Sequence, residues 1–249
     1  MTLRLNVNVL SLVEHQGAVT GVNIECDGQQ ETLQARCGVV LAAGGFAAGE
    51  LAARYRPHTR EHYSMSPAGN DGAAFRLASA LNACEGADLS SNFFWAPVSV
   101  LRRPDGTQER FPHLVTDRAK PGVIAVNQHA VRFVNESNSY HHFASAMQSQ
   151  AENAPCFLIC DAQAMKRYGL GLARPAPVNN DALVKAGYLH KADTLPELAQ
   201  RLGLDPHTLA ETVARYNRDA AQGLDPAFTK GGNSYNRAMG DPGHRPNAC

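Results

Sequence analysis

The sequence predicts a mixed fold in two parts, an α/β part over residues 1–92 and an α+β part over residues 93–242. Strand-like alternation fills the first 35 residues, an unbroken apolar run follows at residues 38–43, and two well-delimited helices lie within residues 195–220. The chain has 249 residues. Because domains average about 150 residues, one large domain or two small ones are expected.

The first part begins with three predicted strands. Residues 5–13 alternate between apolar and polar side chains, as a half-buried strand does, and residues 19–25 and 31–35 complete the set. His15-Gln16-Gly17 and Asp27-Gly28 supply turn residues between them. We therefore expect an antiparallel meander.

A buried strand and a helix are predicted next. The apolar run at residues 38–43 is typical of a strand covered on both faces. It ends in Gly44-Gly45, which either lets a ligand approach free backbone N–H groups or makes a tight turn. Residues 70–83 show helical spacing of apolar side chains, and Asp71 is a suitable cap for that helix.

The second part is predicted to contain a strand pair. Residues 123–126 and 131–134 are apolar runs that flank a turn at residues 127–130. Arg132 and Glu136 follow closely and are expected to be structural partners, because a carboxylate beside a strand end usually forms a pair or a cap.

Two helices near the end of the chain have clear boundaries. Thr194 and Glu197 form a capping box, and Gly203 ends the first helix. Asp205 caps the second helix. Its apolar face is formed by Leu209, Val213, Tyr216 and Ala220. The last 20 residues are rich in Gly, Asn and Pro and are predicted to form a loop.

Composition excludes several classes of function. Lys+Arg and Asp+Glu both number 23, so the net charge is zero and the sequence predicts no nucleic-acid binding. No run reaches the roughly 18 apolar residues of a membrane span. Six scattered cysteines without a C-x-x-C pair, and an N-terminus without a leader, predict a cytoplasmic protein with reduced, mostly buried thiols. No G-x-G-x-x-G fingerprint occurs in the chain.

Four motifs occur together in the order and spacing of a known family. They are GVVLAAGGF at residues 38–46, NDGAAFRLASALNA at residues 70–83, VRFVNESNSY at residues 131–140, and the helical segment at residues 195–228. In this combination the chain resembles the fumarate reductase/succinate dehydrogenase-like flavoproteins, and the resemblance covers nearly all of it.

The resemblance implies a partial FAD-binding domain followed by a substrate-capping domain. Residues 1–92 resemble an FAD domain without its N-terminal Rossmann motif, residues 93–242 resemble the cap, and residues 243–249 resemble the start of the return to the FAD domain. The chain is thus expected to be an internal fragment. The resemblance implies FAD as cofactor, bound by Val9, Ala43, Gly44, Gly45 and Asp71.

The branch of the family is suggested by Tyr140. Fumarate reductases carry an arginine as proton donor at the position of Tyr140, and tend to carry His-Pro-Thr in the stretch where this chain has Phe94-Trp95-Ala96-Pro97. A tyrosine after "NE" is similar to that of 3-ketosteroid Δ1-dehydrogenases, where it is the catalytic base. The resemblance therefore implies that Tyr140 is the base, acting on an apolar, ketosteroid-like carbonyl substrate beside Trp95, Thr116 and Asp117.

Several alternatives stay open at this stage. Dicarboxylate reduction is one, and a truncated chain that does not bind FAD alone is another. There are also structural alternatives: Tyr140 is a residue that bridges core and surface, and Thr116-Asp117 is a surface turn. His58 and His62 have the spacing of zinc ligands on a helix but lack the H-E-x-x-H order, so no metal is predicted. Self-association is expected through the apolar face at residues 39–46.

Overall fold

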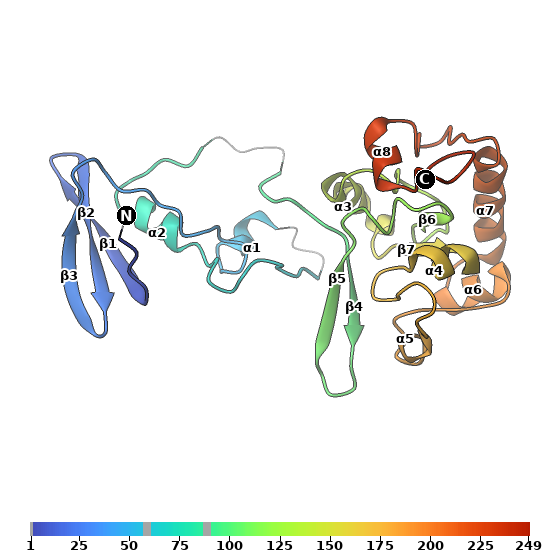
Figure 1. Cartoon of the computed structure of the whole chain (residues 1–249), viewed down its shortest axis with the longest axis horizontal. Helices are drawn as coiled ribbons and strands as arrows, with labels where there is room; N and C mark the ends of the chain where they lie inside the picture. Colours follow the sequence, from blue (N-terminus) through green and yellow to red (C-terminus); the bar gives the residue numbers. More distant parts are fainter. Residues whose placement is uncertain (1, 57–60, 87–90) are drawn as a thin grey trace. The chain divides into compact units, whose positions relative to one another are not determined.

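The computed structural model describes residues 2–56, 61–86 and 91–249 (Figure 1). The chain divides into two compact units, Met1–Phe93 and Phe94–Cys249. The boundary expected from the sequence lies between residues 92 and 93. The assignment of the first unit as an FAD-binding part and of the second unit as a substrate cap stays a prediction.

The first unit contains the predicted meander. Strands β1 (Val7–His15), β2 (Ala18–Cys26) and β3 (Gln29–Gln34) form an antiparallel sheet in the order β1-β2-β3. Both turns have two residues with positive φ, 54° and 81° at Gln16-Gly17 and 51° and 77° at Asp27-Gly28. This geometry matches the right-handed twist of the strands, so the turn residues set the register as expected.

The prediction of a buried strand over residues 38–43 is wrong. This segment has no strand structure, and Val40 is 89% exposed and Leu41 37% exposed. A strand buried on both faces needs neighbouring strands that bond its backbone groups. In the part of the chain that the structure describes, no strand pairs with this segment.

Two short helices complete the described part of this unit. They are α1 (Ala52–Tyr55) and α2 (Ala73–Ser79). The second starts later than the predicted residues 70–83, because Gly72 has a φ of 91°, outside the helical region, and it ends earlier, at Ser79. It contacts β1.

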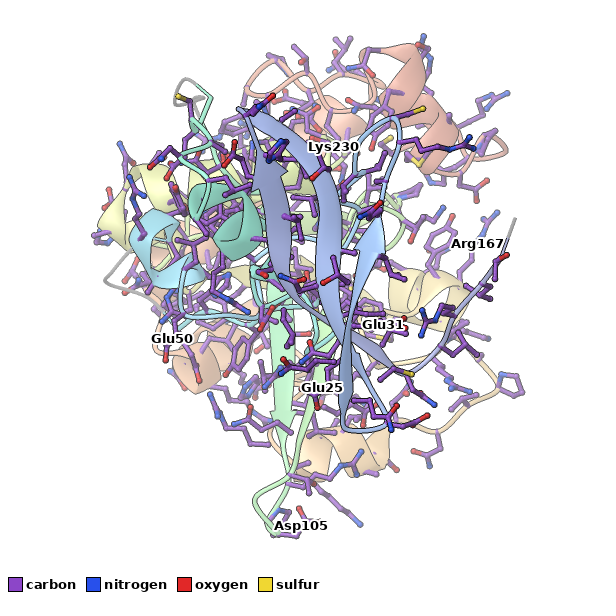
Figure 2. All side chains as sticks on the ribbon, turned by 90° about the vertical axis from the view of Figure 1, so that its left-hand side faces the viewer. Glu25, Glu31, Glu50, Asp105, Arg167 and Lys230 are labelled. Carbon is purple, nitrogen blue, oxygen red and sulfur yellow. The ribbon has the colours of Figure 1, made fainter. Side chains whose placement is uncertain are left out.

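The second unit contains two separate strand pairs. Strands β4 (Val98–Arg102) and β5 (Gln108–Pro112) form a hairpin with Asp105 at its tip (Figure 2). Strand β6 (Val123–Val126) pairs with β7 (Phe157–Cys160). The predicted pairing of residues 123–126 with residues 131–134 is therefore wrong, apart from one bridge between Val126 and Arg132.

Helices surround the β6–β7 pair on the right of Figure 1. They are α3 (Tyr140–Ser149), the 3₁₀ turn η1 (Ala151–Asn153), α4 (Ala162–Tyr168), α5 (Asp181–Lys185), α6 (Leu195–Leu202), α7 (Pro206–Ala220) and α8 (Ser234–Met239). Within the described ranges, no helix is long and apolar enough to cross a membrane.

The capping predictions for α6 and α7 are confirmed. The Thr194 side chain accepts a hydrogen bond from the Glu197 N–H, and Gly203 ends α6 with a φ of 69°. Asp205 caps α7 by accepting from the Thr208 N–H. These caps satisfy backbone donors that have no partner within the helix.

The main core lies between α6, α7 and the β6–β7 pair. Leu209 is fully buried, and Tyr216 of the same α7 face is 9% exposed. They pack with Ala199 of α6 and with Ile124 and Val126 of β6. The predicted apolar face of α7 is thus the face that forms the core.

The last 20 residues are more ordered than the loop prediction. They contain α8, which is capped by Asn233 through the N–H of Asn236. The Cys249 thiol contacts the Asn236 carbonyl oxygen at 3.0 Å, so the chain end packs on α8. Among the six cysteines only Cys249 is buried, and Cys37 and Cys84 are exposed, so the expectation of mostly buried thiols is wrong.

A buried ion network joins β6 to the chain that follows it. Arg132 donates to both carboxylate oxygens of Glu136, at 2.8 and 2.7 Å, and to both of Asp225, at 2.8 and 2.9 Å. The Lys230 ammonium lies 3.9 Å from Glu136 and donates to the Val123 carbonyl oxygen. The expected partnership of Arg132 and Glu136 is confirmed.

The network also satisfies the free edge of β6. Glu136 accepts the Ala125 N–H at 3.0 Å, while Lys230 binds the Val123 carbonyl oxygen. Side chains therefore form hydrogen bonds with the backbone groups of β6 to which a strand at residues 131–134 would have bonded. This explains why the predicted strand pair does not form.

Breaking this network should strongly destabilise the second unit. In Glu136→Gln, Arg132 keeps only one carboxylate partner in a buried position. We expect a loss of about 3–5 kcal/mol in the free energy of unfolding, measured by urea titration of the fluorescence of Trp95, the single tryptophan. The control is Glu109→Gln in the exposed pair with Arg103, where about 1 kcal/mol or less is expected. Equal losses would contradict this account.

Asp225 should make stability dependent on acid pH. Burial opposes its ionisation, but the hydrogen bond and charge of Arg132 outweigh this and lower the pKa of Asp225. Its contribution is complete above the unfolded value of about 3.9 and is lost as pH falls through the lower folded pKa. Urea titrations between pH 6 and pH 2 should show a shallower acid loss in Asp225→Asn than in the wild type.

Candidate active site

Tyr140 begins helix α3 and is half-buried. Ser139 caps this helix by accepting a hydrogen bond from the His142 N–H. The Tyr140 hydroxyl makes no hydrogen bond with any residue that the structure describes. Its phenol, at the start of helix α3, is thus free to contact a substrate.

Arg118 fixes the segment that leads to Tyr140. Its guanidinium donates to the carbonyl oxygens of His113 at 2.9 Å, Glu136 at 2.5 Å and Asn138 at 3.2 Å, and also to that of Leu114. Arg118 is fully buried, and this burial lowers its pKa to about 10. One side chain therefore joins residues 113–118 to residues 136–138.

Trp95 lies beside the same end of α3. Its backbone N–H donates to the Nδ1 atom of His141 at 3.1 Å, and the ring of Phe94 meets the His141 ring edge-on at 5.7 Å between centroids. Phe94 is 86% exposed and Trp95 is half-buried. The structure thus brings Trp95 next to the neighbour of Tyr140.

Thr116 and Asp117 differ in their surroundings. Thr116 is exposed, whereas the Asp117 side chain is only 12% exposed and contacts His113 Nδ1 at 2.5 Å. Burial opposes the ionisation of Asp117, but the hydrogen bond from His113 outweighs it and lowers the pKa of Asp117. Asp117 is therefore a buried charged partner rather than part of a solvated turn.

Three further residues join Asp117 that the sequence analysis missed. His113 Nε2 lies 2.7 Å from Ser99 Oγ, and Ser99 Oγ lies 2.6 Å from the Tyr188 hydroxyl. The spacing of four residues between His113 and Asp117 was a usable signal in the sequence. Ser99 and Tyr188 come from distant segments, and no local pattern marks them.

Four of the five predicted cofactor residues lie close together in the first unit. The Gly72 N–H donates to the Gly45 carbonyl oxygen at 3.0 Å, and a Cβ atom on Gly44 would overlap with the Asn70 side chain. Residues 43–45 therefore lie against residues 70–72. Val9 stands opposite Ile24 in the sheet, and no described hydrogen bond connects it with the other four.

These residues fit a bound dinucleotide in part. The N–H groups of residues 43–45 make no backbone hydrogen bond with the described residues, and a Cβ atom on Gly45 would meet open space. Free N–H groups on an exposed glycine segment suit anionic oxygens. Asp71 is already engaged, since it accepts from the Ala73 N–H at 3.0 Å and from Arg76 at 2.8 Å. Its pKa is lowered by Arg76.

No metal centre emerges from the described residues. They contain no group of three or more His, Cys, Asp or Glu side chains that could hold an ion. His58, one of the two histidines weighed above, lies outside the described residues.

Known proteins match the chain along nearly its full length. Residues 1–248 match the model of a family described as FAD binding domain. The chain belongs to this family. FAD is the cofactor of the family, and the resemblance stated from the motifs is confirmed.

Two relatives are dehydrogenases of cyclic ketones by name. A 4-oxocyclohex-2-ene-1-carboxylate 5-dehydrogenase of Sinomonas cyclohexanicum is 41% identical over 93% of this chain and 40% of its own. A 3-oxosteroid 1-dehydrogenase of Mycobacterium tuberculosis (strain ATCC 25618 / H37Rv) is 31% identical over 98% of this chain and 45% of its own. The chain thus spans less than half the length of these relatives.

A solved structure shares the fold. The 3-ketosteroid Δ1-dehydrogenase of Sterolibacterium denitrificans, in complex with 1,4-androstadiene-3,17-dione, aligns with a TM-score of 0.80 and 31% identity. The alignment covers 98% of this chain and 45% of that one. The chain therefore has the fold of a part of that dehydrogenase.

Gly171 should be needed for the close packing around Tyr188. Its φ is 59°, and a Cβ atom there would overlap with the Tyr188 hydroxyl and lie 3.0 Å from His113 Cε1. Gly187 has a φ of 71° and open space around it, so it is a matched control. We expect Gly187→Ala to cost about 1–2 kcal/mol from backbone strain alone. Gly171→Ala should cost about 1–3 kcal/mol more from overpacking, measured by urea unfolding.

Proposed function

We propose that this chain is part of an FAD-dependent dehydrogenase that introduces a carbon–carbon double bond next to the carbonyl of a cyclic ketone. The observation that carries the proposal is the free phenol of Tyr140, which is the last residue of the VRFVNESNSY motif and the first of α3. Two relatives whose names describe the dehydrogenation of cyclic ketones support it.

Tyr140 is the base in this proposal. Dehydrogenation next to a ketone removes a proton from the α carbon, and the Tyr140 phenolate accepts it. When bound, FAD supplies the acceptor for the hydride that leaves the β carbon. Residues 43–45 and Asp71 are the groups that would hold FAD, the former through free backbone N–H groups.

The substrate is a ring ketone with an apolar body. A ring ketone is common to the ketosteroid inferred from the motifs and to the names of both relatives, a 4-oxocyclohex-2-ene-1-carboxylate dehydrogenase and a 3-oxosteroid dehydrogenase. Trp95 provides apolar surface beside α3, and Asp117 lies in the segment that the resemblance places at the substrate. Reduction of a dicarboxylate is the alternative, and the tyrosine in place of an arginine disfavours it.

Cofactor binding is tested first. The absorbance spectrum of the purified chain is recorded before and after addition of excess FAD and again after gel filtration. A flavin band that persists through gel filtration is expected. Its absence would contradict FAD binding by this chain and would favour a chain that needs further segments for the cofactor.

The base is tested next, in the FAD-loaded chain. With 4-oxocyclohexanecarboxylate or a 3-ketosteroid and an artificial electron acceptor, Tyr140→Phe should lower kcat about 10²- to 10⁴-fold, because the proton acceptor is removed. Tyr235→Phe, at an exposed tyrosine of the same unit, should leave kcat unchanged. Equal effects of the two changes would refute the role of Tyr140, and turnover of fumarate alone would favour the alternative.

A further inference from the structure

Two neighbouring aromatic residues of the second unit contact the start of helix α3 through one histidine. The backbone N–H of Trp95 donates to His141 Nδ1 at 3.1 Å. The Phe94 ring meets the His141 ring edge-on, with 5.7 Å between the centroids. A polar and an apolar contact thus both end on His141, and this side chain binds the Phe94–Trp95 segment to α3.

The hydrogen bond from Trp95 fixes the state of the His141 ring. A ring nitrogen that accepts a hydrogen bond carries no proton, and a charged imidazole has protons on both nitrogens. His141 therefore accepts through Nδ1 as a neutral ring with its proton on Nε2. The contact needs an acceptor atom attached to Cγ. Asparagine has one too, because its Oδ1 atom is bonded to Cγ as Nδ1 is in histidine.

His141 and the candidate base border the same buried position of α3. Residues three and four apart in sequence are neighbours on the surface of a helix. Ala144, which is buried together with Phe143, is therefore next to both Tyr140 and His141. The segment that His141 binds thus lies against the same end of the helix as Tyr140.

A second set of contacts holds this segment from its other side. The His113 N–H donates to the Pro97 carbonyl oxygen at 2.9 Å, and Arg118 donates to the His113 carbonyl oxygen at 2.9 Å. Arg118 also donates to the Asn138 carbonyl oxygen at 3.2 Å, at the entry to α3. Together with the contact on His141, these hydrogen bonds form a closed circuit between the segment and the helix. Loss of the His141 contact alone should therefore leave the unit folded.

The Phe94 ring is held in place but is not covered. Phe94 is 86% exposed, whereas Trp95 is half-buried. Residues 91–101 contain no charged side chain. An aromatic ring on a segment fixed from both sides loses little conformational freedom when a ligand contacts it. The segment therefore offers a rigid, uncharged and apolar surface beside the start of α3.

We propose that His141 is a positioning residue which holds Phe94 and Trp95 as an apolar wall for the ring body of the substrate. This rests on the proposed function, in which Tyr140 removes a proton from the carbon next to the ketone. The wall contacts the carbon skeleton of the ring ketone. His141 does not touch the substrate, but it sets where the wall stands relative to α3.

The positioning is tested without FAD or substrate. Trp95 is the single tryptophan, so its fluorescence reports on the segment directly. His141→Leu and His141→Asn are similar in size, but only asparagine keeps an acceptor. Acrylamide should quench Trp95 more strongly in His141→Leu than in the wild type, and His141→Asn should restore the protection. His142→Leu, at the exposed neighbouring position, should have no effect.

Two results of this experiment would overturn the positioning role. One is equal quenching in His141→Leu and His141→Asn, because the acceptor would then be irrelevant. The other is a His141→Leu chain that fails to fold by circular dichroism, because the circuit through Arg118 should keep the unit folded.

The wall itself is tested in the FAD-loaded chain with 4-androstene-3,17-dione and an artificial electron acceptor. Phe94→Ala should raise KM about 10-fold, because an apolar ring that the substrate covers is lost. His141→Leu should raise KM about fivefold, the effect of one hydrogen bond on an equilibrium, and His141→Asn should recover most of it. In all three variants kcat should stay unchanged, since the wall binds substrate and transition state alike.

The matched control is Leu224→Ala, at an exposed leucine after α7, which should leave KM unchanged. An unchanged KM in Phe94→Ala would overturn the wall. A kcat that falls in His141→Leu as far as in Tyr140→Phe would overturn the positioning role, because His141 would then act in the chemical step.

Failure of this proposal can be told apart from failure of the proposed function. A wild-type chain that binds FAD but never reduces it with a ring ketone refutes the proposed dehydrogenation. Equilibrium dialysis of 4-androstene-3,17-dione then decides whether the wall exists. Phe94→Ala should raise the dissociation constant about 10-fold, whether or not turnover occurs. Equal dissociation constants in Phe94→Ala and the wild type, or no binding to the wild type, would overturn the wall.

Discussion

The Arg132 guanidinium lies inside the second unit between two carboxylates and two aromatic rings. Glu136 and Asp225 each bind it through both oxygens, and the rings of Tyr216 and Phe228 lie 4.7 and 5.1 Å from it. A buried charge of this kind is tolerated only when all its donors are satisfied. Arg132 therefore ties together the segment after β6, helix α7 and the segment after α7.

The candidate active site depends on this arrangement. Glu136 binds Arg132 through its side chain and Arg118 through its backbone oxygen. Two buried arginines thus meet at one residue, four positions before Tyr140. Since Arg118 also binds the His113 carbonyl oxygen, the same contacts hold the start of α3 and the Asp117–His113 pair. The chemistry proposed for Tyr140 needs this rigidity, because a base must keep its distance from the substrate carbon.

The first unit has a different kind of organisation. Its meander is well formed, but residues 38–43 lie exposed beside the glycines that are expected to bind FAD. The apolar side chain of Val40 is 89% exposed and that of Leu41 37% exposed, and self-association through this face stays a prediction. The free backbone N–H groups of residues 43–45 in the same segment can donate hydrogen bonds to an anionic ligand.

Local features of the fold were readable from the sequence. The positive-φ turns at Gln16-Gly17 and Asp27-Gly28, the capping box at Thr194 and the cap at Asp205 were predicted because each is decided within a few residues. The family and its cofactor were also readable, since four motifs in a fixed order mark them.

Only the tertiary structure decided which strands pair and which side chains meet. Residues 131–134 have the apolar pattern of a strand, yet Glu136 and Lys230 take the backbone groups of β6 that such a strand would have bonded. Likewise, Ser99, His113 and Tyr188 come together from separate segments. Contacts between residues far apart in the chain depend on how whole elements pack, and no local pattern in the sequence encodes that packing.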